Sequence, residues 1–213
     1  MRKPVSAISR SRSWSRMLVQ AWRISTISTS SAARTSLSFS FIYPLYLDAV
    51  VAVEDHRFEQ HWGIDLIAIG RAAWNNLISW SLREGGSTIT QQLAKNMYFT
   101  QEKSFIRKIA EMFMAFRLEN TYTKDKILEL YVNSIYFGDG YYCVRDASRG
   151  YFGKEPIDMT GYESTLLAGI PNAPSVYSLT ANPDLAKQRQ QYVIQQMVRY
   201  GYISEDEGKE LSQ

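Results

Sequence analysis

The sequence predicts a single, mostly helical domain, and three observations support that fold class. Helix-start signals recur along the chain, including the capping boxes Thr160-x-x-Glu163 and Ser204-x-x-Glu207. No stretch of alternating polar and apolar residues is long enough to predict a sheet core. The length of 213 residues and the hydrophobic content of 45% suit one globular core.

Three helices are predicted in the earlier part of the chain, and the Gly85-Gly86 turn separates the first from the second. One spans 64–77 and follows Gly63. A second spans 87–96 after the Gly85-Gly86 pair, where the Ser87 hydroxyl can cap the free amides of the first turn. The third spans 100–119 and is nearly all apolar, so we expect it to be a buried element.

Four further helices are predicted in the second half of the chain. The fourth spans 123–136, and the fifth runs from the first capping box to Pro171. The sixth has Asn182 as its cap and Pro183 at its first position, and Gly201 closes it. A short last helix opens at the second capping box.

The formal charge of +3 is unevenly distributed. Residues 1–47 hold seven of the 24 basic residues and none of the 21 acidic ones, so residues 48–213 carry a net charge of −4. Nucleic-acid binding requires an extended positive surface, and a mildly acidic domain with one local group of cations does not provide it. We therefore expect no nucleic-acid partner. The cations of that group are Lys95, Lys103, Arg107 and Lys108.

The first 43 residues are rich in Ser and Arg and lack periodicity. We expect them to be a disordered segment or a misassigned start ahead of a folded domain over 44–213, and a transit peptide is the alternative interpretation of their composition. The longest uncharged run, 35–47, has 13 residues and contains Pro44, whereas a membrane-spanning helix needs about 20 apolar residues. No transmembrane anchor is predicted, so we expect any membrane association to be peripheral.

The segment 85–96 (GGSTITQQLAKN) is typical of an anion-binding helix start. The amides of the first turn, the helix dipole and Lys95 two turns later together suit a phosphate group. Gln92, Lys95 and Asn96 lie at i, i+3 and i+4 and so share one face. An ordinary polar helix surface with a serine cap is the alternative interpretation.

A second set of charges lies on the predicted third helix. Lys103, Arg107, Lys108 and Glu111 fall within an arc of about 140° on a helix that is otherwise apolar. A solvated i,i+4 salt bridge is the simpler interpretation. However, surplus positive charge in apolar surroundings is costly unless an anion meets it, and a ligand phosphate would do so.

Glu54 follows the apolar run 51–53, and this position favours a reactive carboxylate. Partial desolvation would raise its pKa and prepare it to act as a general base. The alternative is a helix-terminal acid paired with Arg57. His56 and His61 lack a zinc-binding spacing, so we expect both to be hydrogen-bonded structural histidines.

Five sequence blocks, in order over about residues 44–211, closely resemble the peptidoglycan glycosyltransferases. This is glycosyltransferase family 51, found as monofunctional enzymes and as the amino-terminal domain of class A penicillin-binding proteins. The blocks are Glu54-Asp55-x-x-Phe58-x-x-His61-x-Gly63; Gly86-Ser87-Thr88-Ile89-Thr90-Gln91-Gln92-Leu93-x-Lys95-Asn96; Arg107-Lys108-x-x-Glu111; Lys126-Ile127-Leu128-Glu129-x-Tyr131-Val132-Asn133; and Tyr151-Phe152-Gly153-Lys154 with Leu166–Ser175.

The resemblance implies a lysozyme-like, mostly α fold with a small membrane-facing lobe. It implies polymerisation of the lipid-linked disaccharide-pentapeptide (lipid II) into β-1,4 glycan strands of peptidoglycan, with inversion and release of undecaprenyl diphosphate. The implied partners are lipid II, the growing lipid-linked glycan, the membrane surface on the outer face of the bacterial cell membrane, and other cell-wall synthesis proteins.

The resemblance also implies roles for particular residues. Glu54 corresponds to the base that deprotonates the acceptor 4-hydroxyl. Glu111 corresponds to a second essential glutamate, which positions phosphate or could hold a divalent cation such as Mg or Mn; no organic cofactor is implied. The diphosphate-binding set is Ser87, Gln92, Lys95, Asn96, Lys103 and Lys108, to which the cation group on the third helix adds Arg107.

Several features depart from the family pattern. Family members usually have Arg at the position of Lys103, and the planar guanidinium of Arg can form a bidentate contact with phosphate. Cys143, the single cysteine, replaces a usual glycine and excludes an internal disulfide. No Ser-x-x-Lys motif with Lys-Thr-Gly follows, so a monofunctional enzyme or a fragment is expected.

Two other functions are compatible with parts of the sequence. A lysozyme-like hydrolase or lytic enzyme would also use two carboxylates, but it would have no diphosphate to bind. An inactive structural member of a cell-wall assembly complex would be expected if Glu54 and Glu111 were altered, and both are present.

The segment 74–82 is expected to contact the bilayer. Tryptophan prefers the membrane interface, and an apolar surface gives reversible binding. Packing of the same side chains in the core is the alternative. The residues concerned are Trp74, Leu77, Ile78, Trp80 and Leu82.

Overall fold

The computed structural model describes residues 37–79, 85–99 and 105–213, and within these ranges it contains helices and no strand, which confirms the mostly α fold class. Short 3-10 turns occur at 39–41, 58–60, 156–158 and 170–172. The α-helices are α2 (Pro44–Glu54), α3 (Leu66–Ser79), α4 (Ile89–Tyr98), α5 (Phe105–Thr121), α6 (Lys124–Val132), α7 (Val144–Phe152), α8 (Gly161–Gly169), α9 (Pro183–Arg199) and α10 (Glu205–Leu211).

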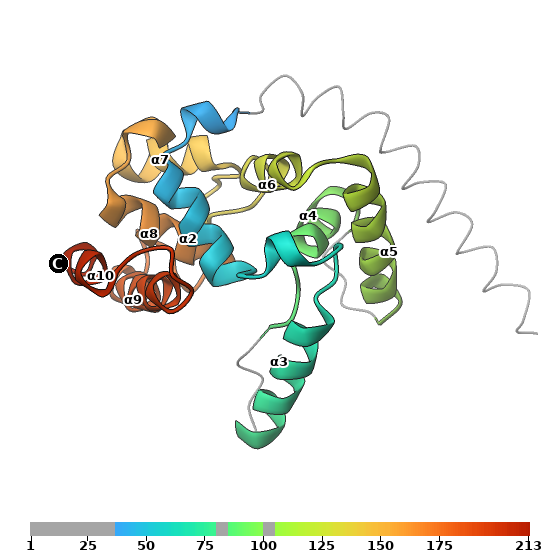
Figure 1. The fold of residues 1–213 in the computed structure, drawn as a ribbon. Coiled ribbons are helices and arrows are strands. Elements are labelled where there is room, and N and C mark those ends of the chain that lie inside the picture. Colours follow the sequence, from blue (N-terminus) through green and yellow to red (C-terminus); the bar gives the residue numbers. More distant parts are fainter. Residues whose placement is uncertain (1–36, 80–84, 100–104) are drawn as a thin grey trace, which may run out of the picture.

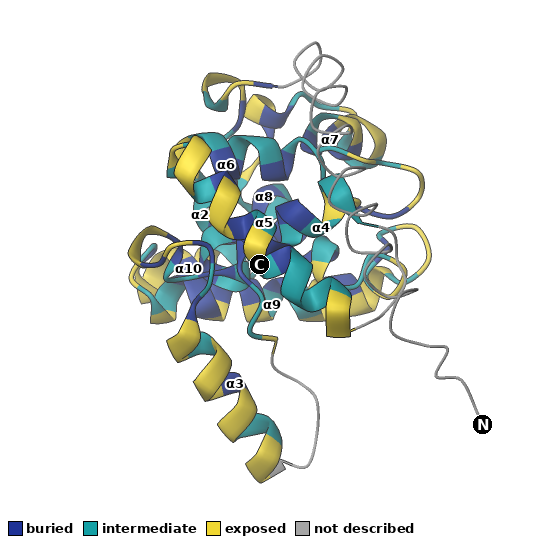
Figure 2. Ribbon diagram, turned by 90° about the vertical axis from the view of Figure 1, so that its right-hand side faces the viewer, coloured by how far each residue is buried: buried dark blue, intermediate teal, exposed yellow. Residues whose placement is uncertain are grey.

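The helices form two packed groups with α2 leading from one towards the other (Figure 1). In the first group α2, α8 and α9 pack against one another, and α10 packs on α9. In the second group α4 packs against α5 and α6. One continuous core of buried apolar residues joins both groups (Figure 2). Its largest members include Tyr46, Tyr131, Phe58 and Phe137.

Helix α2 carries Glu54 at its last position. Pro44 stands at the start of the helix, where its missing N–H is not needed, and no charged residue other than Asp48 precedes Glu54 in it. Tyr46, Ala49 and Val50 are buried, so α2 is a central element of the core. The bounds of this helix were not predicted, because its apolar residues lie on all of its sides and do not form one stripe.

The turn after α2 is fixed by the buried carboxylate of Asp55. His61 Nε2 lies 2.9 Å from both carboxylate oxygens, and the Ile89 backbone N–H donates to Oδ2 at 3.0 Å. Since Ile89 begins α4, this single side chain holds the end of the Glu54 helix against the start of the predicted anion-binding helix. His61 is a hydrogen-bonded, buried histidine, as predicted.

Gly63 brings α5 close to the same turn. Its φ is +77°, a conformation that residues with a Cβ rarely adopt. A Cβ there would also lie only 3.0 Å from the Ala115 backbone carbon, so both the backbone conformation and the space favour glycine. The Gly63 carbonyl accepts a hydrogen bond from the Thr88 hydroxyl at 2.7 Å. The loop between α2 and α3 is thereby bound to both α4 and α5.

Several predicted helix boundaries are confirmed. Thr160 and Ser204 form the expected capping boxes, and Pro183 and Gly201 lie at the two ends of α9, with Gly201 at φ +77°. The predicted fourth helix is shorter than expected, because α6 ends at Val132. Helix α7 was not predicted.

Two expectations about individual helices are wrong. The cap of α4 is Thr88, which forms a capping box with Gln91, and Ser87 instead accepts a hydrogen bond from Lys108. Helix α5 is not a buried element, since the exposed fractions of Phe105 and Phe113 are 79% and 67%. Apolar residues lie on two faces of this helix. One face packs against the core, and no described residue covers the other.

Helix α3 projects away from the rest of the molecule (Figures 1 and 2). Its start is held by Asp65, whose Oδ1 accepts from the backbone N–H groups of Ile67 and Ala68. A Cβ on Gly86 would lie 3.0 Å from the Ile69 Cα, so glycine allows the turn before α4 to pass close to α3. Within the described residues, no helix has the length and apolarity needed to cross a membrane.

The packed part of the chain begins before the predicted domain boundary at 44. Leu37 and Ile42 are buried in the core, and Leu37 exchanges two hydrogen bonds with the Asn133 side chain, at 2.9 and 3.0 Å. Residues 1–36, which contain most of the segment expected to be disordered, lie outside the described residues.

We predict that Asp55→Ala lowers the free energy of unfolding by about 3 kcal/mol, because it leaves a buried imidazole and a buried amide without their partner. Urea unfolding followed by circular dichroism measures the change. Asp206→Ala is the control, since Asp206 is exposed and contacts only Lys209 on its own helix, and it should unfold like the unmodified chain. Equal stability of the two variants would contradict the linking role of Asp55.

Candidate active site

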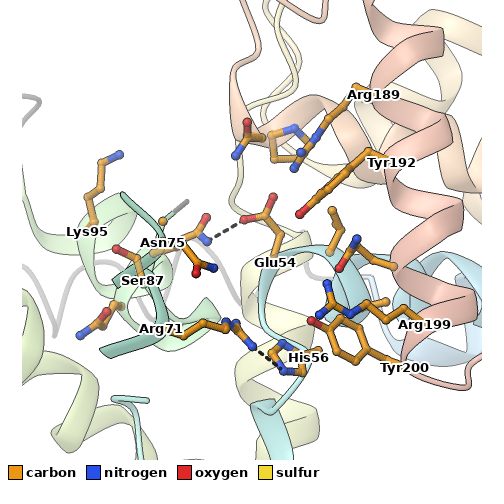
Figure 3. A pocket seen from close by; sticks show the side chains of 18 of the residues that line it. Glu54, His56, Arg71, Asn75, Ser87, Lys95, Arg189, Tyr192, Arg199 and Tyr200 are labelled. Atoms are coloured by element: carbon orange, nitrogen blue, oxygen red, sulfur yellow. Dashed lines mark hydrogen bonds between the residues drawn. The ribbon is translucent and has the colours of Figure 1, made fainter. Parts of the chain in front are cut away.

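A cavity of about 380 Å³ lies where the two helix groups meet, and α3, α4, α5 and α9 contribute side chains to it (Figure 3). Glu54 lies between the α4 side, where Ser87 and Lys95 are found, and the α9 side, where Arg189 and Tyr192 are found. The cavity brings together most of the residues predicted from the sequence: Glu54, Ser87, Gln92, Lys95, Lys108 and Glu111.

Glu54 has the partly desolvated carboxylate that the sequence predicts. Burial raises its pKa, and this outweighs a hydrogen bond from Gln92 and the nearby charge of Arg189, which both lower it. The Gln92 Nε2 donates to Oε2 at 2.8 Å, while Oε1 is buried with no hydrogen-bond partner among the described residues. The alternative pairing with Arg57 is wrong, because Arg57 contacts Asp65 and Gln60.

Glu111 is buried and holds two cations of α5. The Arg107 Nε lies 2.9 Å from Oε1, and the Lys108 Nζ lies 3.2 Å from Oε2. Lys108 also donates to the Ser87 hydroxyl at 2.8 Å, which connects α5 to the turn before α4. Two positive charges share one carboxylate here, so the positive surplus predicted from the sequence remains at the cavity wall.

The other residues of the predicted binding set differ in position. Lys95 lines the cavity and makes no ion pair with a described residue. Asn96 is exposed and Arg107 pairs with Glu111, and neither of them lines the cavity. Lys103 lies outside the described residues. The roles assigned to all these residues stay predictions.

The α9 side of the cavity was not predicted from the sequence. Arg189, Tyr192, Gln196 and Arg199 line it from positions i, i+3, i+7 and i+10, the spacing of a single helix face. This spacing was visible in the sequence. However, it indicated only an amphipathic helix, and nothing local related that helix to Glu54.

His56 connects the two sides of the cavity mouth. Its ring stacks on Tyr200 with centroids 3.9 Å apart, and its Nε2 lies 3.3 Å from the Arg71 Nη1 of α3. Burial lowers the pKa of His56, and the charge of Arg71 lowers it further. His56 is therefore a packed, hydrogen-bonded histidine that also lines the cavity.

The described side chains do not fit a resident metal site. Nowhere in the described ranges do three or more His, Cys, Asp or Glu side chains gather closely enough to hold an ion. Both oxygens of Glu111, the carboxylate predicted to bind a divalent cation, already contact Arg107 or Lys108. Mg²⁺ usually takes only one or two carboxylates and completes its shell with water and substrate phosphates. Any such ion would therefore have to arrive with a phosphate ligand.

This arrangement is suited to a defined chemistry. A carboxylate with a raised pKa can accept a proton, and cations fixed a short distance away can stabilise an anion that forms at the same time. The carboxylate and the cations line the same cavity. The geometry therefore supports a substitution reaction in which a nucleophile loses a proton and an anionic leaving group departs.

Comparison with known proteins identifies the class. The sequence profile of the transglycosylase family matches residues 21–198. The chain belongs to the transglycosylase family, which confirms the resemblance to the peptidoglycan glycosyltransferases.

Individual relatives agree with this assignment. The chain is 49% identical over 159 residues to a Cupriavidus necator protein provisionally named a transglycosylase, covering 75% of this chain and 68% of that one. It is 46% identical over 174 residues to penicillin-binding protein 1F of Bacillus subtilis, covering 82% of this chain and 24% of the relative. It is 48% identical over 157 residues to penicillin-binding protein 1A of Neisseria lactamica, covering 74% and 20%.

The chain thus spans about a quarter or less of the length of the penicillin-binding proteins that it matches. Among solved structures, the crystal structure of penicillin-binding protein 1A from Haemophilus influenzae has a TM-score of 0.50 and 20% sequence identity. The match covers 84% of this chain and 17% of that one. It supports the lysozyme-like fold predicted from the sequence.

We predict that Lys95→Ala and Lys108→Ala each weaken the binding of inorganic pyrophosphate and of a phosphoglycolipid such as moenomycin. Each change removes a charge-assisted contact of about 1.5–3 kcal/mol, so the dissociation constant should rise about tenfold or more. Isothermal titration calorimetry measures it. Lys209→Ala, which removes an exposed lysine of α10, is the matched control. If Lys95→Ala and Lys108→Ala bound these ligands like that control, the anion site would have to lie elsewhere.

Proposed function

We propose that the chain polymerises lipid II into β-1,4-linked glycan by an inverting transfer that releases undecaprenyl diphosphate. The observation that carries the proposal is the placement of Glu54, with its raised pKa, in the same cavity as the cations around Ser87 and Glu111. The substrates proposed are lipid II as acceptor and the growing lipid-linked glycan as donor.

The proposed step is a single displacement at C1 of the donor sugar. Glu54 takes the proton of the acceptor 4-hydroxyl as that oxygen attacks C1. The bond between C1 and the diphosphate oxygen breaks, and the diphosphate leaves with the bonding electrons. Lys95 and Lys108 stabilise the charge on the leaving diphosphate, which reduces the need for a protonating acid. Attack from the side opposite the leaving group inverts the configuration at C1.

A divalent cation enters this proposal only with the substrate. The diphosphate could carry Mg or Mn into the cavity, where Glu111 lies at the wall. Since Glu111 already contacts two cations of the protein, no step of the reaction is assigned to a metal. No organic cofactor is needed, because the diphosphate already activates the donor.

The hydrolase alternative receives less support from the cavity. A glycosidase of the lysozyme type uses one carboxyl group to protonate the leaving oxygen and another to act on the sugar. The second carboxyl group of this cavity, Glu111, contacts Arg107 and Lys108 through both of its oxygens. A neutral glycan would also leave those cations without an anion to bind.

The proposed location is the outer face of the bacterial cell membrane, with other cell-wall synthesis proteins as partners. Lipid II holds its undecaprenyl chain in the bilayer, so the cavity must work close to the lipid headgroups. Helices α3 and α5 expose large apolar side chains that suit such a surface: Leu66, Ile67, Trp74, Leu77, Ile78, Phe105, Phe113 and Phe116.

The function is tested by incubating the purified chain with labelled lipid II and separating the products by gel electrophoresis. We predict glycan polymer with the unmodified chain and at least a hundredfold less with Glu54→Gln, because an amide cannot accept the proton. The rate should fall as the pH drops through the raised pKa of Glu54, since protonation removes the base.

Three outcomes would contradict parts of the proposal. Shortening of preformed glycan without polymer would favour the hydrolase. No product from a folded, unmodified chain would favour the structural member of an assembly complex. Retention of more than about a tenth of the activity in Glu54→Gln would remove Glu54 from the role of base.

We predict that Trp74→Ser with Leu77→Ser lowers co-sedimentation with anionic liposomes and polymerisation on them, with an almost unchanged melting temperature. Both side chains are 65% exposed, so little core packing is lost. Ile157→Ser, which alters an exposed apolar residue on a different element, is the control. A large drop in melting temperature with membrane binding preserved would assign Trp74 and Leu77 to the core. Trp80 and Leu82, also expected at the bilayer, lie outside the described residues.

A further inference from the structure

The buried hydroxyl of Tyr131 is linked to Glu54 through one intervening side chain. The Tyr131 hydroxyl donates to the Gln92 Oε1 at 3.1 Å, and the Gln92 Nε2 donates to the Glu54 Oε2 at 2.8 Å. These residues come from α6, α4 and α2, so the link crosses between the two helix groups. Tyr131 is fully buried and is not among the residues that line the cavity.

From these contacts we infer that Tyr131 is a positioning residue that holds Gln92 in the one orientation in which its amide donates to Glu54. The inference rests on the proposed function in which Glu54 is the general base. Tyr131 touches neither the cavity nor a substrate within it, so its effect must pass through Gln92.

The chemistry of the amide explains why a fixed orientation matters. A glutamine amide has a donor end and an acceptor end of nearly the same shape, and a half-turn exchanges them. With the oxygen towards Glu54, two acceptors would face each other and the carboxylate would lose its hydrogen bond. The Tyr131 hydroxyl, by donating to Oε1, holds the amide with its Nε2 towards Glu54; in the flipped orientation the hydroxyl would have to accept from Nε2, and the amide oxygen would face the carboxylate.

Tyr131 remains a donor throughout the working range of the enzyme. Burial raises its pKa well above 10, and the negative charges of Glu54 and of Asp55 raise it further. The phenol therefore keeps its proton at any pH at which Glu54 could act as a base. It offers a constant hydrogen bond to the amide.

The remaining groups around Glu54 do not replace this bond. Arg189 approaches from α9 and lowers the pKa of Glu54 by its charge, whereas Asp55 raises it. Tyr46, on α2 itself, has a buried hydroxyl with no hydrogen-bond partner among the described residues. The other titratable or charged side chains that line the cavity are His56, Arg71, Lys95, Lys108, Glu111 and Arg199. In the described part of the chain, the Glu54 carboxylate accepts a hydrogen bond from Gln92 alone.

The test is Tyr131→Phe, which removes one oxygen and keeps the ring in the core. We expect kcat at neutral pH to fall about tenfold, with KM for lipid II nearly unchanged. The acid limb of kcat/KM against pH should move to higher pH, because a Glu54 without its hydrogen bond is harder to ionise. A wild-type acid limb in Tyr131→Phe would overturn the inference, even if the melting temperature fell.

Two further variants separate positioning from stability. Tyr151→Phe is the matched control, because the Tyr151 hydroxyl donates to the Phe137 carbonyl and to Asp139, away from Glu54. It should leave the acid limb where it is. Gln92→Ala should move the limb in the same direction as Tyr131→Phe. The double variant should add nothing to Gln92→Ala alone, and an additive effect would overturn the route through Gln92.

A measurement without substrate makes the result independent of the proposed function. The carbon-13 signal of the Glu54 carboxylate, assigned by its loss in Glu54→Gln, should titrate at higher pH in Tyr131→Phe than in the unmodified chain. If the unmodified chain made no polymer but this shift occurred, the proposed function would fail and the link would stand. If the chain made polymer and the titration was unchanged, the link alone would fail.

Discussion

The buried carboxylate of Asp55 is the contact on which the rest of the site depends. It binds His61 on one side and the first amide of α4 on the other, so the end of α2 and the start of α4 keep a fixed separation. Glu54 precedes Asp55 directly, and Gln92 and Lys95, which are predicted to bind an anion, follow Ile89 within two turns. A buried, hydrogen-bonded carboxylate is a rigid connector, because every alternative leaves polar groups unpaired in the core.

The two carboxylates that line the cavity, Glu54 and Glu111, have different surroundings. Glu54 lies in surroundings that oppose its ionisation, which keeps it ready to take a proton. Glu111 contacts Arg107 and Lys108, and Lys108 in turn donates to the Ser87 hydroxyl. Similar residues therefore acquire opposite tasks from their neighbours. Under the proposed function, one carboxylate acts on the attacking oxygen and the other supports the charge on the leaving one.

The sequence was sufficient where the deciding interactions are local. The capping boxes at Thr160 and Ser204 involve residues three apart, and the raised pKa of Glu54 follows from the apolar run before it. It was insufficient where distant segments decide. Ser87 is held by Lys108 from another helix, which its sequence neighbours do not indicate, whereas the capping box of Thr88 with Gln91 is local and was overlooked in favour of Ser87. The α9 wall around Arg189 likewise meets Glu54 only through the packing of α9 against α2.

Helix α5 shows why apolar composition alone does not predict burial. Phe105 and Phe113 are exposed, whereas Glu111 between them is 2% exposed, the reverse of what polarity suggests. The buried glutamate is tolerated because two cations meet its charge. The exposed rings lose the gain of burial, about 25 cal/mol for each Å² of apolar surface, unless a second apolar phase covers them. A lipid surface would recover that free energy without changing the core. Under the proposed function, the same helix would then face both the bilayer that holds the lipid tail of the substrate and the cavity that binds its diphosphate.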